Sequence, residues 1–224
     1  MKVLVACEES QRVCIAFREY GDEAYSCDVE PCSGGHPEWH IQADVIPLLN
    51  GCCKFLTCDG TTHYIKSSWD LIIAHPPCTY LSNAGARHLW KGHVLNYERY
   101  LKGLLAKEFF MNIYNANCKH IAIENPVPSR IYQLPEKSQV IQPYYFGHPY
   151  TKRTQLWLKD LPLLMPTKIV EPVATWCPSG SYSCEHSKQY RGMFTTDRAK
   201  NRAKTFSGVA YAMAEQWRLS LIHI

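Results

Sequence analysis

The sequence predicts an α/β fold in which a parallel sheet is covered by helices on both faces. Five short apolar runs have the length of buried strands, and they alternate with longer segments whose apolar residues recur at helical spacing. The apolar runs span residues 3–6, 24–27, 71–74, 121–123 and 155–158. Strands that are apolar throughout are typical of sheets buried on both sides. With 224 residues, 46% of them hydrophobic, the chain is long enough for one such domain.

The segments between the strands predict helices and one hairpin. Residues 10–20 have apolar side chains near helical spacing, and Gly21 suits the C-terminal cap of that helix. Residues 51–68 contain an Asp-Gly pair between β-rich flanks, which predicts a hairpin. Residues 95–117 contain no proline and predict a long helix, and residues 207–217 predict a final one.

Residues 162–204 differ in composition from the rest of the chain. They are rich in Pro, Ser, Tyr and basic residues and show little periodicity. Their clustered cations are Lys188, Arg191, Arg198, Lys200, Arg202 and Lys204. We therefore predict a main domain of residues 1–161 plus 205–218 and a small basic lobe of residues 162–204. The last six residues, 219–224, back-translate to a transposon end used in library preparation, so we expect them to be a non-native tail.

Composition restricts the possible partners. A formal charge of +4 permits a nucleic-acid partner without requiring one. The sequence has no apolar run of about 18 residues and no signal-peptide pattern, so we expect a cytoplasmic protein with no membrane partner. In that compartment the eleven cysteines should be thiols. Two Cys/His sets lack the paired Cys-x-x-Cys spacing of structural zinc sites, so we expect no metal. These sets are Cys177, Cys184 and His186, and Cys52, Cys53, Cys58 and His63.

Polar residues follow four of the predicted strands, at the sheet edge where parallel α/β proteins bind ligands. They are Cys7–Ser10, Asp28, His75–Cys78 and Glu124–Pro126. Pro76 and Pro77 cannot continue a strand ladder, so they hold Cys78 on a rigid turn at the mouth of the sheet. A partly exposed thiol with a fixed direction of attack is a candidate nucleophile.

These motifs resemble those of the cytosine C5-methyltransferases. Pro77–Gly85 reads Pro-Cys-Thr-Tyr-Leu-Ser-Asn-Ala-Gly, and the family's nucleophile motif is Pro-Cys-Gln-x-Phe-Ser-x-Ala-Gly. Glu124–Pro126 is similar to the family's Glu-Asn-Val, and residues 151–155 match its Gln-x-Arg-x-Arg in part, with Arg153 as the shared arginine. The resemblance covers most of residues 1–160 and the last helix, and looks closest to short methylase-like proteins of phages and gut bacteria. It implies a Rossmann-like methyltransferase sheet with a small target-recognition lobe.

The resemblance implies roles for four catalytic residues. The Cys78 thiolate would add to C6 of cytosine, which makes C5 nucleophilic. Glu124 would hydrogen-bond and protonate N3, and Asn125 would help to position Glu124 or its loop. Arg153 would carry positive charge near the base carbonyl or the glutamate. A base in a duplex cannot be reached, so the cytosine would be flipped out or already single-stranded.

The resemblance also implies residues for S-adenosylmethionine and for DNA, single- or double-stranded. The loop with Cys7, Glu8, Glu9 and Ser10 would hold the methionine portion of the cofactor, although it lacks the family's glycines. Asp28 would bind the ribose hydroxyls, Asp44 the adenine amine, and Pro76 would lie against the cofactor. Nucleic-acid contacts would come from Ser82, Lys188, Arg191, Arg198, Lys200 and Arg202.

Other functions remain open at this point. The same chemistry could act on RNA, because recognition would lie in the irregular lobe. The altered first loop could hold a different donor, or none, for another base modification. The chain could also be a DNA-binding protein with a vestigial active site.

Overall fold

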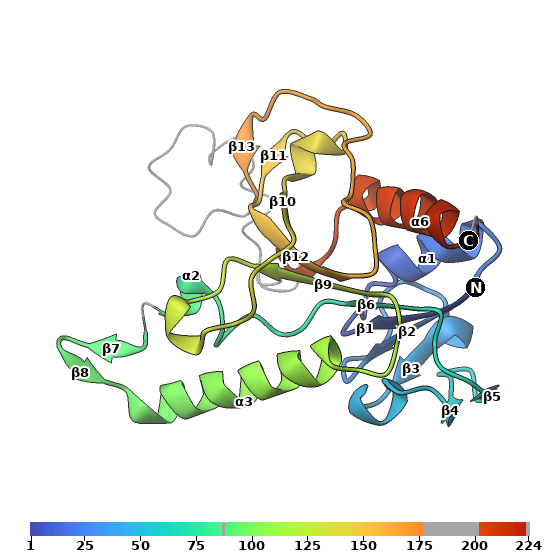
Figure 1. Cartoon of the computed structure of the whole chain (residues 1–224), viewed down its shortest axis with the longest axis horizontal. Coiled ribbons are helices and arrows are strands. Elements are labelled where there is room, and N and C mark those ends of the chain that lie inside the picture. Colours follow the sequence, from blue (N-terminus) through green and yellow to red (C-terminus); the bar gives the residue numbers. More distant parts are fainter. Residues whose placement is uncertain (87, 177–201, 223–224) are drawn as a thin grey trace.

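A computed structural model of the chain describes residues 1–86, 88–176 and 202–222 (Figure 1). Its centre is a seven-stranded sheet in the order β10-β12-β9-β6-β1-β2-β3. The strands are β1 (Lys2–Ala6), β2 (Glu23–Asp28), β3 (His40–Gln42), β6 (Leu71–Ala74), β9 (Ile121–Pro126), β10 (Gln139–Ile141) and β12 (Thr154–Lys159). The protein is therefore a mixed α/β protein built on one central sheet, as the sequence predicts.

The sheet is mostly parallel. Strands β3, β2, β1, β6 and β9 pair in parallel, whereas β12 runs antiparallel to both β9 and β10. The prediction of a parallel sheet is thus wrong at β12, because a fully buried strand has the same apolar pattern in either direction. The order of the strands reverses at β1, which has β2 on one side and β6 on the other. Such a reversal opens a crevice beyond the carboxyl ends of the two central strands.

Helices cover both faces of the sheet (Figure 1). Helices α1 (Arg12–Glu19) and α6 (Ser207–Ile222) lie together on one face, and α3 (Tyr97–Tyr114) lies on the other. Helix α1 buries Val13, Cys14, Ala16 and Phe17 against the sheet. The chain leaves α1 through Gly21 at φ 82°, the left-handed conformation expected of a glycine cap.

The longest helix, α3, begins at a polar cap. The Asn96 side chain accepts a hydrogen bond from the backbone N–H of Arg99 at 3.2 Å. The helix then buries Phe110 and Ile113, and its Gly103 lies against the Tyr132 ring, which leaves no room for a Cβ. These contacts fix α3 against the sheet.

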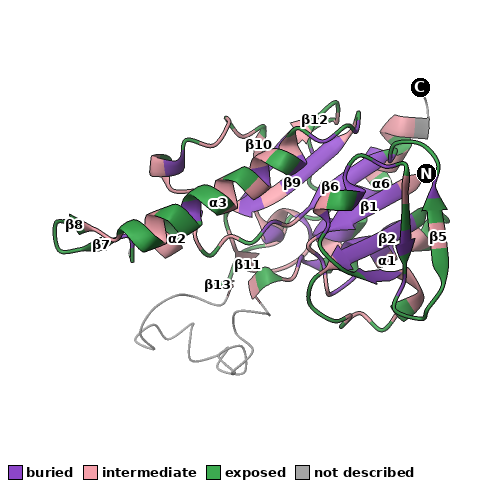
Figure 2. Cartoon of the chain, turned by 90° about the horizontal axis from the view of Figure 1, so that it is seen from below, coloured by how far each residue is buried: buried purple, intermediate pink, exposed green. Residues whose placement is uncertain are grey.

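The strands at the centre of the sheet are buried (Figure 2), and they separate two apolar clusters because successive side chains point to opposite faces. Val5 and Ile73 pack with α1 and α6, whereas Leu4 and Ile72 pack with α3. The sheet is therefore buried on both faces, and it holds its strand ends in fixed positions.

Smaller elements surround the sheet. β4 (Cys53–Leu56) and β5 (Thr62–Ile65) form the predicted hairpin, and β7 (Trp90–Lys91) and β8 (Val94–Leu95) form a second hairpin that projects beyond α3 (Figure 1). α2 (Asn83–Ala86) follows the Cys78 turn, and β11 (Tyr150–Thr151) pairs with β13 (Ala174–Thr175). The 3₁₀ helices span Pro37–Trp39, Ile46–Leu48, Arg130–Tyr132 and Pro143–Tyr145.

The boundaries of the basic lobe stay a prediction. Residues 177–201 lie outside the described residues, but Leu164 at the start of the predicted lobe is buried with α6 and the sheet. Helix α6 continues past Trp217 to Ile222, so residues 219–222 prolong it. Among the described residues, no helix is long and apolar enough to span a membrane.

Candidate active site

The loops after β1 and β6 meet the end of β9 beside the reversal of strand order. Ala6 pairs with Ala74, and Ala74 pairs with Ile123, so β1 and β6 end level with the residue of β9 that precedes Glu124. The backbone N–H of His75 donates to the Ala6 carbonyl at 3.0 Å and ties the β6 loop to β1. The predicted convergence of the strand-end motifs is therefore confirmed for these loops.

The turn that carries Cys78 is held at both ends. The buried Asn125 donates from Nδ2 to the Pro76 carbonyl at 3.1 Å, and the Ser82 backbone N–H donates to the Cys78 carbonyl at 2.9 Å. Pro76 is buried, whereas the Cys78 residue is half-buried. The sulfur is therefore on a fixed turn that solvent reaches, as the two prolines predict.

Ser82 and Gly85 stabilise the next turn. The Ser82 side chain is buried and accepts from the Gly85 backbone N–H at 3.2 Å, so it caps α2 rather than facing outward. A Cβ on Gly85 would lie 2.2 Å from the Thr79 carbonyl oxygen, which explains a glycine at this position. Arg99 of α3 donates to the carbonyls of Thr79 and Gly85 at 3.2 and 3.1 Å.

The Glu124 carboxylate lies in a cluster of polar side chains on the face covered by α1 and α6. His75 Nδ1 lies 3.1 Å from Glu124 Oε2, and Thr205 Oγ1 donates to the same oxygen at 3.2 Å. Lys152 Nζ lies 4.0 Å from the other oxygen, Oε1. The side chains of His75 and Glu124 are each only 10% exposed, so the charges interact with little screening by water.

These neighbours determine the charge state of the pair. Burial by itself would raise the pKa of Glu124, but the pairing with His75 and the charge of Lys152 outweigh it and lower the pKa to about 2. Burial by itself would lower the pKa of His75, but Glu124 and the more distant Glu8 outweigh it and raise that pKa. The favoured state is therefore a Glu124 carboxylate beside a protonated His75.

The Cys78 thiol responds to the same cluster. Burial raises its pKa, the charges of Lys152 and Arg202 oppose that rise, and Glu124 adds to it. The resting thiol is therefore protonated, and two cations lie where they would stabilise a thiolate. Cys78 and Glu124 thus belong to one electrostatic site.

The cation beside Glu124 differs from the one predicted. Lys152 lies next to the carboxylate, whereas the neighbouring Arg153 is exposed. Lys152 therefore occupies the position beside the glutamate, one of the two predicted for the charge of Arg153, and the other position, near the base carbonyl, stays a prediction. Adjacent residues in an extended chain point in opposite directions, so a motif match that is one residue off selects the wrong side chain.

Two buried polar atoms at the site have no hydrogen-bond partner among the described residues. They are His75 Nε2 and Asn125 Oδ1. An unpartnered buried polar atom costs about 1–3 kcal/mol, which makes such atoms candidates for a functional role. Sequence reasoning assigned no role to His75, Lys152 or Thr205. The only signal was a histidine between an apolar strand and two prolines.

Three of the predicted cofactor residues lie close together. The pKa of Cys7 is raised by burial and further by the charges of Asp28 and Asp44, so both carboxylates are near this thiol. Asp28 Oδ1 accepts from the Glu30 N–H, and Asp44 Oδ1 accepts from the Ile46 N–H, each at 3.0 Å. Oδ2 of each aspartate takes no hydrogen bond from the described residues. Each carboxylate thus has a free acceptor for a hydroxyl or an amine.

Glu8 has a different environment. Its carboxylate is buried and accepts the N–H groups of Val13 and Cys14 at 2.7 and 3.2 Å, so it caps the N-terminus of α1. Ser10 is also buried, and Glu9 accepts from Ser33 in the following loop. A side chain of the first loop therefore accepts hydrogen bonds from the free backbone N–H groups at the N-terminus of α1.

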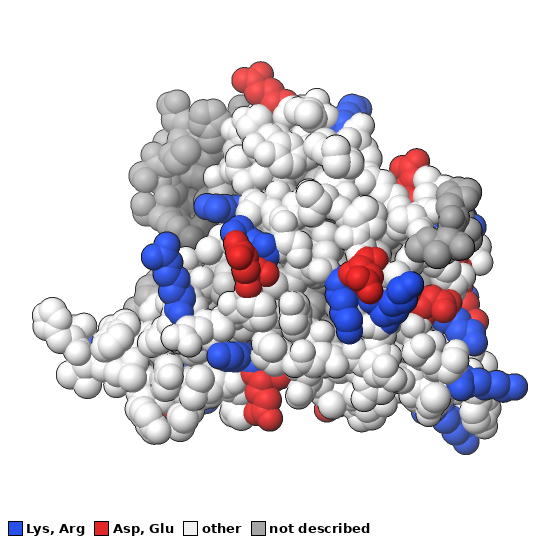
Figure 3. Space-filling view, viewed as in Figure 1, with Lys and Arg blue, Asp and Glu red and all other residues white. Residues whose placement is uncertain are grey.

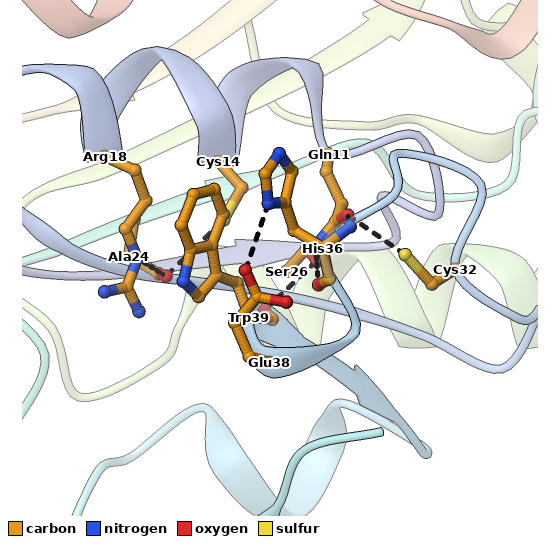
Figure 4. Close-up of polar contacts among 9 residues, drawn as sticks. All are labelled: Gln11, Cys14, Arg18, Ala24, Ser26, Cys32, His36, Glu38 and Trp39. Atoms are coloured by element: carbon orange, nitrogen blue, oxygen red, sulfur yellow. Dashed lines mark hydrogen bonds and ion pairs between the residues drawn. The ribbon is translucent and has the colours of Figure 1, made fainter. Parts of the chain in front are cut away.

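Gln11 attaches the loop after β2 to this first loop (Figure 4). Its fully buried amide donates to the His36 carbonyl at 2.9 Å and accepts from the His36 N–H and the Cys32 thiol, each at 3.0 Å. Gly34 packs on Gln11 so closely that a Cβ would lie 2.5 Å from the Gln11 Cβ. Residues 32–36 are thus held over the first loop.

The residues present fit one half of S-adenosylmethionine. Asp28 and Asp44 offer acceptors of the kind that a ribose and an adenine amine bind. The N-terminus of α1 cannot accept the amino-acid carboxylate, because Glu8 already occupies its N–H groups. The nucleoside half fits, and the amino-acid half does not fit at this helix terminus.

Two cavities have aromatic and basic walls. One, of about 460 Å³, is lined by Arg12, His148, Tyr150, Trp176, Lys204 and Phe206, and Phe206 follows Thr205 directly. The other, of about 490 Å³, is lined by Tyr80, Trp90, Lys91, Arg99 and Lys102, and Tyr80 lies two residues after Cys78. Aromatic faces beside cations are the surfaces on which nucleotides stack and pair.

Charge elsewhere is mixed. On the face shown in Figure 3, Lys and Arg side chains are interspersed with Asp and Glu. Of the predicted nucleic-acid residues, Lys188, Arg191, Arg198 and Lys200 lie outside the described residues. Arg202 is described, and its charge acts on Cys78.

No group of three potential metal ligands occurs in the described ranges. His63 of the β5 strand instead pairs with Tyr25 Oη at 2.9 Å and Thr57 Oγ1 at 3.1 Å, which uses both ring nitrogens. Of the two Cys/His sets, the one with Cys177, Cys184 and His186 lies outside the described residues.

The fold and this site define the class of protein: an α/β protein with a thiol and a buried acid at the ends of adjacent parallel strands. The chain matches no protein-family model, and a search of curated proteins finds no match.

Proposed function

We propose that this protein is an S-adenosylmethionine-dependent DNA cytosine C5-methyltransferase. The observation that carries the proposal is that Cys78 and Glu124 share one site and that Lys152 acts electrostatically on both. A Rossmann-like methyltransferase sheet is in keeping with the reversal of strand order at β1 and the antiparallel β12. The two cavities with aromatic and basic walls support a nucleic acid as the substrate.

The chain's own residues would perform these steps. Cys78 Sγ would first lose its proton to solvent and then, as a thiolate stabilised by Lys152 and Arg202, bond to C6 of an extrahelical or single-stranded cytosine. The proton on N3 would come from Glu124, and the added electron density would make C5 nucleophilic. S-adenosylmethionine would supply an electrophilic methyl group, with its nucleoside half held by Asp28 and Asp44. Loss of the C5 proton would then release the thiol.

Trapping with a 5-fluorocytosine oligonucleotide tests this proposal. Fluorine does not leave C5 as a proton does, so an active enzyme stalls as a covalent protein–nucleic-acid adduct. We expect a denaturation-resistant adduct in the presence of S-adenosylmethionine. Cys78→Ala should abolish the adduct, and Cys58→Ala, which removes an exposed thiol of the β4–β5 hairpin, should preserve it.

The same assay shows whether the substrate is DNA or RNA, and it distinguishes the proposed function from its alternatives. Parallel DNA and RNA oligonucleotides determine which polymer is modified. DNA binding without any adduct, unchanged by Cys78→Ser, would contradict the proposal and indicate a vestigial site. The Glu8 cap favours one second candidate, a cytosine modification with a different donor. Calorimetry that detects no binding of S-adenosylmethionine would support that alternative.

A further inference from the structure

Among the described residues, His75 is the charged group that lies nearest to Glu124. Its Nδ1 lies 3.1 Å from Glu124 Oε2 and 3.4 Å from Thr205 Oγ1. The Thr205 hydroxyl donates its hydrogen to Glu124, so its oxygen is free to accept from His75. Both neighbours of Nδ1 are therefore acceptors, and Nδ1 carries a proton directed between them.

The two carboxylate oxygens of Glu124 have different surroundings. Oε2 is occupied by His75 and Thr205. Oε1 takes no hydrogen bond from the described residues, and Lys152 Nζ lies 4.0 Å away. Oε1 is thus the oxygen that a substrate can reach, and Oε2 is the oxygen that a proton from inside the protein can reach.

A carboxylate in this state cannot by itself act as an acid. Glu124 is ionised in its environment of cations, and an ionised carboxylate has no proton to donate. The charged and titratable groups that face His75 are Glu124 from β9, Glu8 from the loop before α1, and Lys152 from the segment between β11 and β12. Two of these three are carboxylates, so the protein favours a proton on the imidazole.

We propose that His75 is the proton reservoir of Glu124, a positioning residue that lends the Nδ1 proton when Glu124 protonates the target base. This inference rests on the proposed function and deepens it. As Cys78 Sγ bonds to C6, the displaced electron pair moves to N3. The His75 Nδ1 proton passes to the ionised Glu124 and from there to N3, which leaves Glu124 a carboxylate again and the imidazole neutral. On release of the thiol the proton returns by the same route, so the site gains and loses none.

The matched variants are His75→Asn and Thr205→Val. Asparagine places an N–H donor where His75 has Nδ1, so it can keep the contact with Glu124 but cannot hold a mobile proton. Thr205→Val removes a hydrogen bond to the same carboxylate oxygen and leaves the imidazole intact. The pair separates proton storage from hydrogen bonding.

The first measurement is the rate of adduct formation on the 5-fluorocytosine oligonucleotide across about pH 5.5–9. General acid catalysis commonly contributes 10²–10⁴-fold, so we expect His75→Asn to be roughly 10–100-fold slower at pH 7. The wild-type rate should fall as His75 loses its proton, and His75→Asn should lack this alkaline limb while Thr205→Val keeps it. A His75→Asn rate within threefold of wild type, with the same pH profile, overturns the inference.

The second measurement is NMR of the imidazole nitrogens in the free protein, with His75→Asn identifying the signal. We expect His75 to be protonated at pH 7 in the wild-type protein. In Glu124→Gln, which lacks the carboxylate that raises the pKa of His75, the imidazole should lose its proton at a lower pH than in wild type. A neutral His75 in a protein that still forms the adduct overturns this inference alone. A protonated His75 in a protein that forms no adduct overturns the proposed function. The His75 proton would then have no cytosine N3 to which Glu124 could pass it.

Discussion

The buried carboxylate of Glu8 allows a quantitative prediction for Glu8→Gln. Burial raises the pKa of Glu8 from its usual 4.5 to about 7, despite the opposing charge of His75 and the N–H groups of Val13 and Cys14. A raised carboxyl pKa means that the folded state holds the proton more tightly than the unfolded state. The contribution of Glu8 to stability is therefore largest below pH 4.5 and falls until about pH 7, by about 1.4 kcal/mol per pH unit, or about 3 kcal/mol in total.

Glutamine removes this charge but weakens the cap. Its oxygen can still accept the N–H of Val13, which lies 2.7 Å from Oε1, whereas its amide nitrogen cannot accept the N–H of Cys14. Losing that bond costs about 1 kcal/mol. We expect Glu8→Gln to be about 1 kcal/mol less stable than wild type well below pH 4.5, about as stable near pH 5 and about 2 kcal/mol more stable at pH 8.

Urea unfolding at pH 4.5, 6, 7 and 8 measures this difference, with Glu9→Gln as the matched control at the adjacent, less buried position. The free-energy difference between Glu8→Gln and wild type should change sign with pH, and that of Glu9→Gln should stay near zero. If the difference in unfolding free energy between Glu8→Gln and wild type were the same at pH 4.5 and pH 8, burial of the ionised Glu8 carboxylate would not destabilise the folded state, contrary to this prediction.

Three other substitutions test the contacts around the site. Lys152→Met removes a charge that lowers the Cys78 pKa, so alkylation of Cys78 by iodoacetamide at pH 8 should slow roughly threefold or more. Arg153→Met should leave the alkylation rate unchanged. If Arg153→Met slowed alkylation and Lys152→Met did not, Arg153 would be the cation that acts on the site. Gly85→Ala forces the Thr79 carbonyl away and should cost about 1–3 kcal/mol in urea unfolding, so an unchanged midpoint would contradict the close contact. Gln11→Leu removes the buried amide that holds residues 32–36 and leaves the half-buried backbone groups of His36 unpaired. It should cost about 2–3 kcal/mol and speed proteolysis of residues 32–36, and protection equal to wild type would contradict this role.

Sequence patterns were sufficient for the elements with many local signals. The strand at residues 71–74, the helix around residues 97–114 and the hairpin at residues 53–65 are all confirmed. Each combines apolar spacing with a turn or cap signal. The short strands β3, β10, β11 and β13 have two or three residues each, too few for any periodicity, and only their neighbours in the fold define them.

The candidate site was predictable at the level of strands and less so at the level of side chains. Cys78, Glu124 and Asn125 follow from motifs at strand ends, and the structure brings them together at one edge of the sheet. Lys152 was missed because a match to Arg153 was one residue away from the side chain that faces the carboxylate. Contacts between distant segments, such as Thr205 on Glu124, leave no sign in sequence spacing.

The first loop shows why base chemistry and cofactor binding should be separable by mutation. Its adjacent residues Cys7 and Glu8 have different neighbours: Cys7 responds to the charges of Asp28 and Asp44, and Glu8 to those of His75 and Glu124. Asp44→Asn should therefore weaken binding of S-adenosylmethionine in calorimetry and leave the pH profile of adduct formation unchanged, whereas His75→Asn should do the opposite. If both variants changed both properties, the two groups would form a single coupled network, and the capped helix terminus of α1 would not divide them.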